Sequence, residues 1–421
     1  MIIYPSIGQY HESLVSFKAN INTPEVAAGV PIPAGPTGTD FVHSSGSFAV
    51  VYKIKLNGNY RGLRLWIREV PNSKRIYGEI EKYIKNLPLD YFLDYKLYDA
   101  VNGISVKIDE EWQQFGFIFM DWIQGQNLYS FINDNIHQRP VLEHAAELFL
   151  RMVMDLHANQ ISHGDLQGKN IILFFDQSNS GHPLKIKLVD YDSMYVPALT
   201  GMDDTIIGLA EYQSPYRKDL RKLSPISDYF SELVIYLSLK IYAECPQFWT
   251  KDQADHLLFE DNDFLDPFHS GIFYDLRTKR YGNSDETANL AKILLYMATV
   301  KDIRMLHPLE KVLEMARNGQ YPPNSFNQQL ATARSTQPPA RSPAFGSTTP
   351  SGQRPWGTIP VYQQTKNTLV CSSCQSIIAD PSLIYCPYCF SAIYGMKTCP
   401  NCGARNVPRN AHFCPQCRYK Q

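Results

Sequence analysis

The sequence predicts an α+β protein built from a two-lobed main domain, a Pro/Ser/Thr-rich linker and a small cysteine-rich domain. Three observations support this organisation. Helix-like and strand-like hydrophobic patterns mix over residues 41–318, residues 319–368 hold paired prolines and no acidic side chain, and residues 369–421 contain eight paired cysteines. The total of 421 residues is long enough for all three parts.

The small lobe is assigned to residues 41–122, and residues 1–40, which carry few core signals, are expected to pack on it. The lobe should begin with two strands joined by a turn at Ser45, Gly46 and Ser47. Small side chains let backbone N–H groups approach an anion closely. The same residues also suit an ordinary hairpin, so this turn has two interpretations.

The next strand follows a turn at residues 57–59 and carries Arg64 and, farther along, Arg68. A helix is expected after Pro71. Its apolar stripe consists of Ile76, Ile80, Tyr83, Ile84 and Leu87. Glu79 lies about 85° from the centre of that stripe and Glu81 farther round, so Glu79 is the preferred inward-reaching carboxylate. A solvated glutamate is the alternative.

A buried strand is predicted over residues 115–120, ending at Met120, with Trp122 just beyond it. The large lobe is assigned to residues 123–318. It should contain a buried helix at 145–160, a polar loop at 163–170 and a hairpin of strands 171–175 and 184–189.

The polar loop and the residue after the hairpin carry the strongest chemical signal. Asp165 and Asn170 are five residues apart, and Asp190 follows twenty residues later. This is the minimum set that orients an acceptor hydroxyl and holds Mg²⁺ on a nucleotide. A surface loop that happens to carry these side chains is the alternative.

Helix, loop, hairpin and acidic residue in this order resemble the active site of a protein kinase, and residues 40–316 resemble a kinase domain throughout. Residues 208–215 are similar to the end of a kinase activation segment. Asp228 resembles the residue that braces the catalytic loop from the start of a helix. The His-Gly-Asp-Leu-Gln loop and Asp-Tyr-Asp sequence are similar to a divergent, Hanks-type-related group of bacterial kinase-like proteins, in which a small binding domain follows.

The resemblance implies a two-lobed kinase-like fold with ATP and Mg²⁺ or Mn²⁺ as cofactors. Asp165 would accept the proton of the attacking hydroxyl, and Lys169 would spread charge over the transferred group. Asn170 and Asp190 would hold the metal. The implied nucleotide-binding residues are Ser45, Gly46, Ser47, Arg64, Glu79, Met120 and Trp122. Among them, Glu79 would pair with Arg64, and Met120 and Trp122 would belong to the hinge that binds the adenine.

Several residues depart from the kinase pattern. The spacing from Gly46 puts Arg64 where kinases have a lysine, with Arg68 as the alternative, and a forked guanidinium is wider than an ammonium. Tyr216 replaces the last glutamate of the activation segment. Gly164 replaces an arginine, so no basic pocket is expected to clamp a phosphorylated Thr200 or Thr205.

These features leave three functional hypotheses. The first is an ATP- and Mg²⁺-dependent protein kinase, Ser/Thr-directed, and the second is a pseudokinase that serves as a scaffold or nucleotide sensor. A small-molecule kinase is the third, because such enzymes share the His-Gly-Asp form of the loop. Asp165, Asn170 and Asp190 favour catalysis, whereas Arg64 and Tyr216 favour the pseudokinase.

Eight of the nine cysteines form four Cys-x2-Cys pairs, and eleven residues separate the two pairs of each half. This repeat predicts a double zinc ribbon with two closed tetrahedral sites. The first site would use Cys371, Cys374, Cys386 and Cys389, and the second Cys399, Cys402, Cys414 and Cys417. Disulfides are the alternative, but a chain that opens without a signal peptide is expected to be cytoplasmic, where thiols stay reduced. Cys245 is interpreted as a core residue.

Charge is divided unevenly along the chain. From Gly319 onward nine Lys/Arg face the single Asp380, which gives +8 and leaves −9 for the rest of a chain of net charge −1. The basic tail is therefore expected to bind a protein, either the chain's own acidic domain or a substrate or partner that also contacts the large lobe. Nucleic acid is a less favoured partner, and no membrane span is expected.

Overall fold

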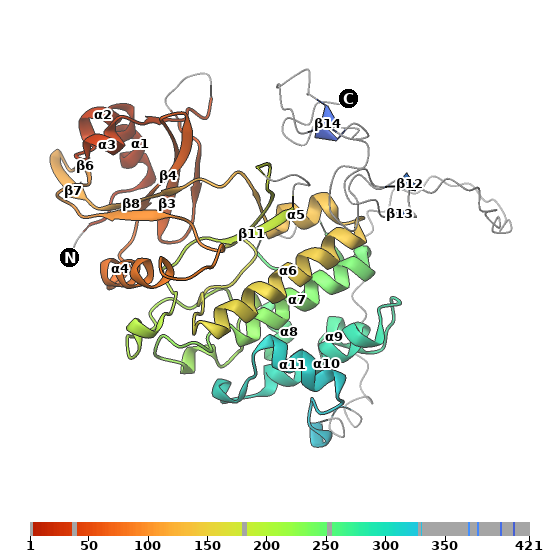
Figure 1. The fold of residues 1–421 in the computed structure, drawn as a ribbon. Coiled ribbons are helices and arrows are strands. Elements are labelled where there is room, and N and C mark those ends of the chain that lie inside the picture. The colour runs from red at the N-terminus through yellow and green to blue at the C-terminus, as the bar shows by residue number, and fades with distance from the viewer. Residues whose placement is uncertain are drawn as a thin grey trace, which may run out of the picture.

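The computed structural model describes residues 3–35, 40–178, 183–250, 255–326 and 330, together with four two-residue strands farther along the chain. The described chain is a mixed α+β structure. Figure 1 shows a sheet part, residues 3–121, beside a mainly helical part, residues 126–330. One cluster of buried apolar side chains lies within the sheet part, and a larger one spans the helical part and the side of the sheet part that includes Trp66, Ile80 and Ile118.

The main sheet has six strands, in the order β1-β3-β4-β8-β5 with β2 paired to β3, and every pairing is antiparallel. The strands are β1 (Val30–Pro31), β2 (His43–Ser45), β3 (Ala49–Leu56), β4 (Asn59–Trp66), β5 (Tyr95–Tyr98) and β8 (Phe117–Asp121). The predicted turn after β3 is confirmed. It consists of Asn57 and Gly58, whose positive φ angles of 50° and 83° suit a tight hairpin turn.

The N-terminal segment supplies α1 (Ile7–Val15), α2 (Phe17–Asn20) and α3 (Pro24–Ala27), and an additional hairpin is formed by β6 (Ile104–Ile108) and β7 (Glu111–Phe115). Residues 1–40 contribute more to the core than expected. Their buried side chains include Tyr10, Leu14, Phe17, Ile21 and Val26. The strand predicted from residue 115 is also corrected, because Phe115 ends β7 and a Cβ on Gly116 would lie 2.6 Å from the Tyr98 carbonyl oxygen.

Helix α4 (Ser73–Ile84) follows the sheet's fourth strand, as predicted. The helical part also holds a small sheet of β9 (Gln126–Asn127), β10 (Ile171–Phe175) and β11 (Leu184–Leu188). The predicted hairpin is confirmed, with Ile171 opposite Leu188. The helices are α5 (Leu128–Asn135), α6 (Arg139–Ala158), α7 (Tyr229–Glu244), α8 (Asp261–Leu265), α9 (Gly271–Arg277), α10 (Asp285–Thr299) and α11 (Leu309–Arg317). Short 3₁₀ helices are η1 (Pro197–Leu199), η2 (Ala210–Tyr212), η3 (Arg217–Asp219), η4 (Pro246–Phe248) and η5 (Ile303–Met305).

Helices α6 and α7 lie side by side through the middle of the helical part (Figure 1). Helix α6 starts six residues earlier than predicted, because Pro140 in its first turn fits where backbone N–H groups need no intrahelical partner. Cys245, just after α7, is buried and free, which confirms its interpretation as a core residue.

The boundary predicted at residue 318 is wrong. Tyr321, Phe326 and Leu330 are buried in the core of the helical part. The rings of Tyr321 and Phe326 lie 5.2 and 5.0 Å from that of Tyr296. The start of the predicted linker therefore belongs to the folded domain, because three apolar side chains spaced along it find a core surface.

Two short hairpins lie in the cysteine-rich segment. Strand β12 (Leu369–Val370) pairs with β13 (Ile377–Ile378), and β14 (Met396–Lys397) pairs with β15 (Val407–Pro408). Each predicted half thus contains one antiparallel pair. The eight cysteines, and most of the predicted linker, lie outside the described residues. In the part of the chain that the structure describes, no helix combines the length and the apolarity that crossing a bilayer requires.

Candidate functional site

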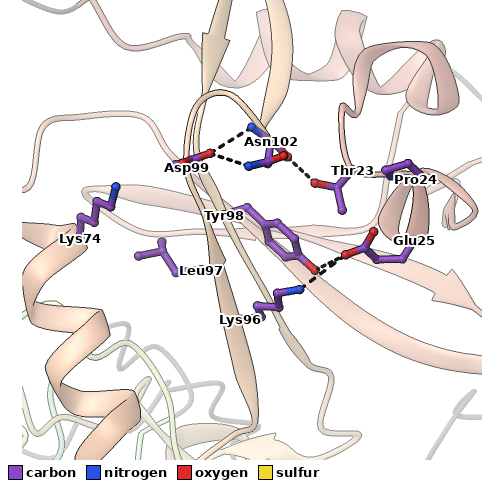
Figure 2. Close-up of a pocket in the computed structure, with 9 residues that line it drawn as sticks. All are labelled: Thr23, Pro24, Glu25, Lys74, Lys96, Leu97, Tyr98, Asp99 and Asn102. Atoms are coloured by element: carbon purple, nitrogen blue, oxygen red, sulfur yellow. Dashed lines mark hydrogen bonds and ion pairs between the residues drawn. The ribbon is translucent and has the colours of Figure 1, made fainter.

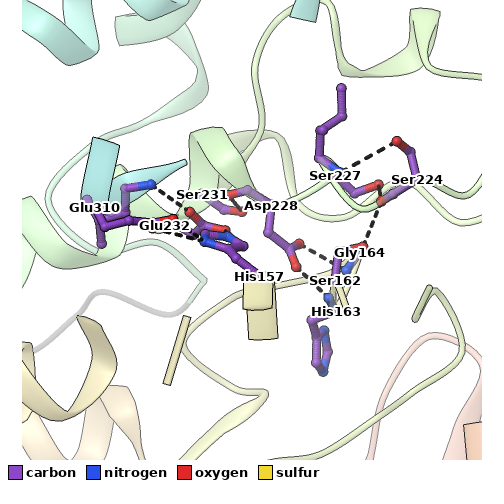
Figure 3. A network of polar contacts seen from close by, with 12 residues as sticks. His157, Ser162, His163, Gly164, Ser224, Ser227, Asp228, Ser231, Glu232 and Glu310 are labelled. Atoms are coloured by element: carbon purple, nitrogen blue, oxygen red, sulfur yellow. Dashed lines mark hydrogen bonds and ion pairs between the residues drawn. The ribbon is translucent and has the colours of Figure 1, made fainter. Parts of the chain in front are cut away.

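The polar loop at residues 163–170 is held in place by Asp228, the N-cap residue of α7 (Figure 3). The Asp228 carboxylate accepts hydrogen bonds from the backbone N–H groups of His163 and Gly164, the latter at 2.9 Å. Burial raises the pKa of Asp228, although the charge of His163 and these N–H donors oppose that rise. The prediction that Asp228 braces the loop is confirmed.

A second polar cluster joins three helices, α6, α7 and α11. His157 of α6 lies 2.7 Å from Glu232 of α7 and 2.9 Å from Glu310 of α11 (Figure 3). Burial by itself lowers the pKa of His157, but the two carboxylates outweigh it and raise the pKa to about 9. The imidazolium therefore holds three helices in one arrangement.

Gly164 is required by the backbone at this point. Its φ is +77°, and an added Cβ would collide with the carbonyl oxygen of Ser193. An L-residue would have to adopt the left-handed region and displace the turn at Ser193. The glycine at this position therefore follows from the path of the chain.

Asp165 is held by its own loop. Its Oδ2 accepts hydrogen bonds from Gln167 Nε2 at 2.8 Å and Asn170 Nδ2 at 3.0 Å. Its Oδ1 is buried and has no hydrogen-bond partner. Gly208 approaches this oxygen so closely that a Cβ there would collide with it. One carboxylate oxygen is thus fixed by two donors, and the other is buried without a hydrogen-bond partner.

Asn170 and Asp190 are connected through Val189, the residue that precedes Asp190. The Val189 N–H donates to the Asn170 carbonyl at 3.0 Å, and His163 Nε2 lies 2.9 Å from the Val189 carbonyl. Asp190 follows with a φ of +68°, and its side chain is 44% exposed. Asp165, Asn170 and Asp190 therefore belong to one rigid unit that presents a partly open carboxylate.

Arg64 of β4 is buried beside this unit. Its Nη2 donates to Asp190 Oδ1 at 3.0 Å and to Asp192 Oδ2 at 2.5 Å. Its guanidinium carbon lies 5.3 and 5.6 Å from the ring centroids of Trp66 and Tyr77. Burial by itself lowers the pKa of Arg64, but the charges of Asp192 and Asp190 raise it overall, so the side chain is a fixed cation.

The predicted pairing of Arg64 with Glu79 is wrong. Glu79 bonds Lys82 at 2.8 Å, and the acidic partners of Arg64 are Asp190 and Asp192. The physical reason is the rotation of α4, which buries Tyr77 and leaves Glu79 on a more exposed side.

The two alternative residues, Glu81 for the carboxylate and Arg68 for the cation, lie elsewhere. Glu81 is occupied by Lys85 on the same helix, and Arg68 is exposed beyond the end of β4. Of the two arginines, Arg64 is therefore the one that faces the acidic loop.

The other predicted site residues make their contacts in different places. Lys169 pairs with Asp255, Met120 lies opposite Gly62 across the β4–β8 pair, and Trp122 lies 5.2 Å from the ammonium of Lys53. The exposed residues Ser45, Gly46 and Ser47 form the β2–β3 turn, closed by the Gly46 N–H on the Ala49 carbonyl at 2.8 Å. The structure brings together Asp165, Asn170, Asp190 and Arg64.

Three residues outside the predicted site belong to it. Asp192 pairs Arg64, Gln167 orients Asp165, and Tyr77 lies against Arg64. The signal for Asp192 in the sequence was the Asp-Tyr-Asp motif, in which a second carboxylate follows Asp190 by two residues. Burial raises the pKa of Asp192, and Arg64 counteracts this rise. Nothing in the sequence marked Tyr77, which occupies a position typical of a core residue.

A separate pocket of about 390 Å³ lies on the sheet part (Figure 2). It is lined by Thr23, Pro24, Glu25, Lys74, Lys96, Leu97, Tyr98, Asp99 and Asn102. Its polar groups bond one another, as in the Tyr98–Glu25 contact at 3.3 Å and the Asn102–Asp99 contact at 3.1 Å. The Asp165–Asp190 unit, which has unpartnered buried oxygens, is therefore the better candidate site.

Comparison with known families identifies the cysteine-rich segment. Residues 371–418 match the double zinc ribbon family, so the chain carries a double zinc ribbon domain. No curated protein matches the chain. The donor set fits zinc, because eight thiol groups in four Cys-x2-Cys pairs provide two complete tetrahedral sites, and one short hairpin accompanies each half.

Proposed function

We propose that this protein is an ATP- and Mg²⁺-dependent protein kinase-like phosphotransferase, Ser/Thr-directed, whose double zinc ribbon recruits protein targets. One observation carries the proposal: Asp165, Asn170 and Asp190 lie in a single loop-and-hairpin unit braced by Asp228. The sheet order β3-β4-β8-β5, helix α4 and the helical part that follows support a two-lobed kinase-like fold. The likeness of the motifs to kinases points the same way.

Asp165 would act on the attacking hydroxyl. Its Oδ2 is fixed by Gln167 and Asn170, and the unpartnered Oδ1 would accept the hydroxyl proton as the hydroxyl oxygen bonds to the γ-phosphorus and the bond from that phosphorus to the ADP oxygen breaks. Gln167 stands where the related kinases carry a lysine. A neutral amide can orient the carboxylate without adding charge, so charge neutralisation must come from elsewhere in the site.

Asn170 and Asp190 offer the oxygen ligands that Mg²⁺ prefers, and Asp190 is exposed enough to reach it. When bound, the metal would neutralise charge on the nucleotide phosphates. Arg64 holds the Asp190 carboxylate in place from the buried side. The exposed turn at Ser45–Ser47 would cover the phosphates, and the strand end at Met120 and Trp122 would receive the adenine.

A pseudokinase is the second candidate, and the Arg64 contacts favour it. The guanidinium already bonds both Asp190 and Asp192, so it is engaged with carboxylates before any phosphate arrives. Lys169 is likewise paired with Asp255. In this alternative the fold would bind nucleotide or a protein partner without transfer.

The test is transfer from γ-labelled ATP with Mg²⁺ or Mn²⁺, alone and with a generic acceptor protein. Asp165→Asn and Asp190→Asn should each reduce labelling by about 100-fold or more, because each removes a group that acts in the transfer step. Asp203→Asn is the matched control, since this exposed aspartate pairs with Lys222 away from the unit.

No labelling by folded, zinc-loaded wild type would contradict the enzymatic proposal. A thermal shift with ATP would then identify a nucleotide sensor, and no shift would identify a scaffold. Equal labelling by Asp165→Asn and wild type would show that the assigned residue does not act in transfer.

A further inference from the structure

Three ligand-type side chains meet on the sheet part, away from the Asp165–Asp190 unit. His11 lies on α1, His43 begins β2, and Asp40 precedes that strand. One ligand atom from each lies within 4.8 Å of the other two. Within the described ranges, no other set of three His, Cys, Asp or Glu side chains approaches this closely.

The backbone around Asp40 is fixed on both sides. The Ala34 N–H donates to the Asp40 carbonyl at 2.8 Å, and the Val42 N–H donates to the Ile32 carbonyl at 2.8 Å. The next residue, His43, pairs with Tyr52 in the sheet. The cluster thus joins a helix, a turn and a strand. Asp40 and His43 are close to each other in the sequence, whereas His11 is distant from both.

The ring nitrogens of His43 have defined roles. Its Nδ1 lies 2.8 Å from the Phe41 carbonyl oxygen, which can only accept a hydrogen bond. In a neutral imidazole this contact places the proton on Nδ1 and leaves the lone pair of Nε2 free. This arrangement, in which a backbone carbonyl fixes the tautomer of a histidine, is the usual support for a metal-binding imidazole.

His11 is placed at a ligand spacing from Asp40. Its Nδ1 lies 3.4 Å from Asp40 Oδ1, too long for a good hydrogen bond. With bonds of about 2.0–2.1 Å, two ligands of a tetrahedral ion stand about 3.4 Å apart. The other nitrogen, Nε2, is buried with no hydrogen-bond partner. Neither nitrogen is therefore satisfied by the protein alone.

The surroundings also suit an ion. The fully buried Tyr52 ring lies 5.3 and 5.5 Å from the imidazoles of His11 and His43 and supports both. The His11 side chain is 20% exposed and that of Asp40 is 61% exposed, so water can reach the cluster and complete the coordination.

We propose that His11, Asp40 and His43 bind one divalent metal ion of the borderline class, with Zn²⁺ as the best match to two imidazoles and a carboxylate. The ion fastens α1 to β2. Because β2 leads directly into the turn at Ser45–Ser47, the ion also limits the movement of that turn. This site is independent of the proposed phosphoryl transfer and of the ribbon cysteines.

The experiment compares zinc bound by full-length wild type and by His43→Gln after equilibrium dialysis at the same free Zn²⁺, measured by elemental analysis. Wild type should bind one more zinc ion per chain than the variant, because the ribbons contribute equally to both and cancel in the difference. His269→Gln is the matched control, since His269 lies 2.9 Å from Asp266 on the surface. It should bind as much zinc as wild type.

Asp40→Asn provides a second variant that leaves the core untouched, and it too should lose the additional ion. Added Zn²⁺ should raise the temperature of the main thermal unfolding transition of wild type and not that of either variant. Equal zinc content in wild type, His43→Gln and Asp40→Asn would overturn the proposal. So would an equal loss in His269→Gln, which would indicate general surface binding.

Discussion

At the residue scale, the site differs from the kinase pattern mainly in how one buried cation is paired. Arg64 forms ion pairs with two carboxylates of the same short loop, those of Asp190 and Asp192, instead of with one carboxylate of a helix. A forked guanidinium can bond two acceptors, whereas an ammonium acts as a point charge. The arginine and the second aspartate are therefore a matched pair, and the helix position facing them is free to hold an aromatic ring, Tyr77.

Removing the positive charge of Arg64 should destabilise the folded protein. Arg64→Leu leaves Asp192, whose side chain is 6% exposed, without a buried partner. The free energy of unfolding should fall by about 3–5 kcal/mol, measured by urea denaturation of the full chain. Arg64→Lys keeps the charge and should lose less. Arg68→Leu, at an exposed position, should stay within about 0.5 kcal/mol of wild type, and a similar loss in both leucine variants would refute the pairing.

At the element scale, the loop depends on helices that are joined by charge. Asp228 and Glu232 lie one turn apart at the start of α7; the first holds the polar loop and the second holds His157. Glu232 also accepts from the Leu309 N–H at 3.2 Å, which adds α11 to the cluster. The position of the loop is therefore coupled to the packing of α6, α7 and α11.

This coupling predicts a pH dependence of stability. The pKa of His157 is raised from 6.5 to about 9 in the folded protein, so its contribution is complete below pH 6.5 and is lost as pH rises through 9. The free energy of unfolding should fall by about 2–3 kcal/mol across this interval, measured by urea denaturation at several pH values. His157→Gln should flatten the profile, whereas exposed His269→Gln should keep it. A profile unchanged by His157→Gln would contradict the assignment.

At the scale of the whole molecule, the chain combines a large domain that folds on its own apolar core with a small one that depends on metal. The two core clusters contain residues between Tyr10 and Leu330. The double zinc ribbon at 371–418 is too short to bury a comparable core, so its folding energy must come from zinc.

Metal removal should separate these two domains. Chelation should unfold the ribbons and leave the main thermal transition of the large domain in place, followed by circular dichroism. Cys386→Ser should bind one zinc ion less per chain than wild type, because one of two Cys₄ sites is broken. Cys245→Ala should bind as much zinc as wild type, since this cysteine is buried in the large domain. An equal loss in both variants would contradict the assignment of ligands.

The sequence predicted much of this organisation because its signals are local. Helix α4, the β10–β11 hairpin and the turn at Asn57 and Gly58 follow from periodicity and turn chemistry over short windows. The spacing of the cysteines predicted the double zinc ribbon that the family comparison identifies. Asp228 was identified by a different route, the resemblance of its segment to the helix start that braces the catalytic loop in protein kinases.

Tertiary structure decided what depends on contacts between distant segments. The choice of Asp192 over Glu79 as the partner of Arg64 depends on how α4 rotates against β4, and periodicity fixes that rotation only coarsely. Burial of Tyr321, Phe326 and Leu330 depends on a surface built by earlier helices. The meeting of His11 with Asp40 and His43 depends on where α1 packs. Sequence by itself determines the kinds of groups and the local elements, whereas packing decides which groups meet, because side-chain contacts are set by three-dimensional distance.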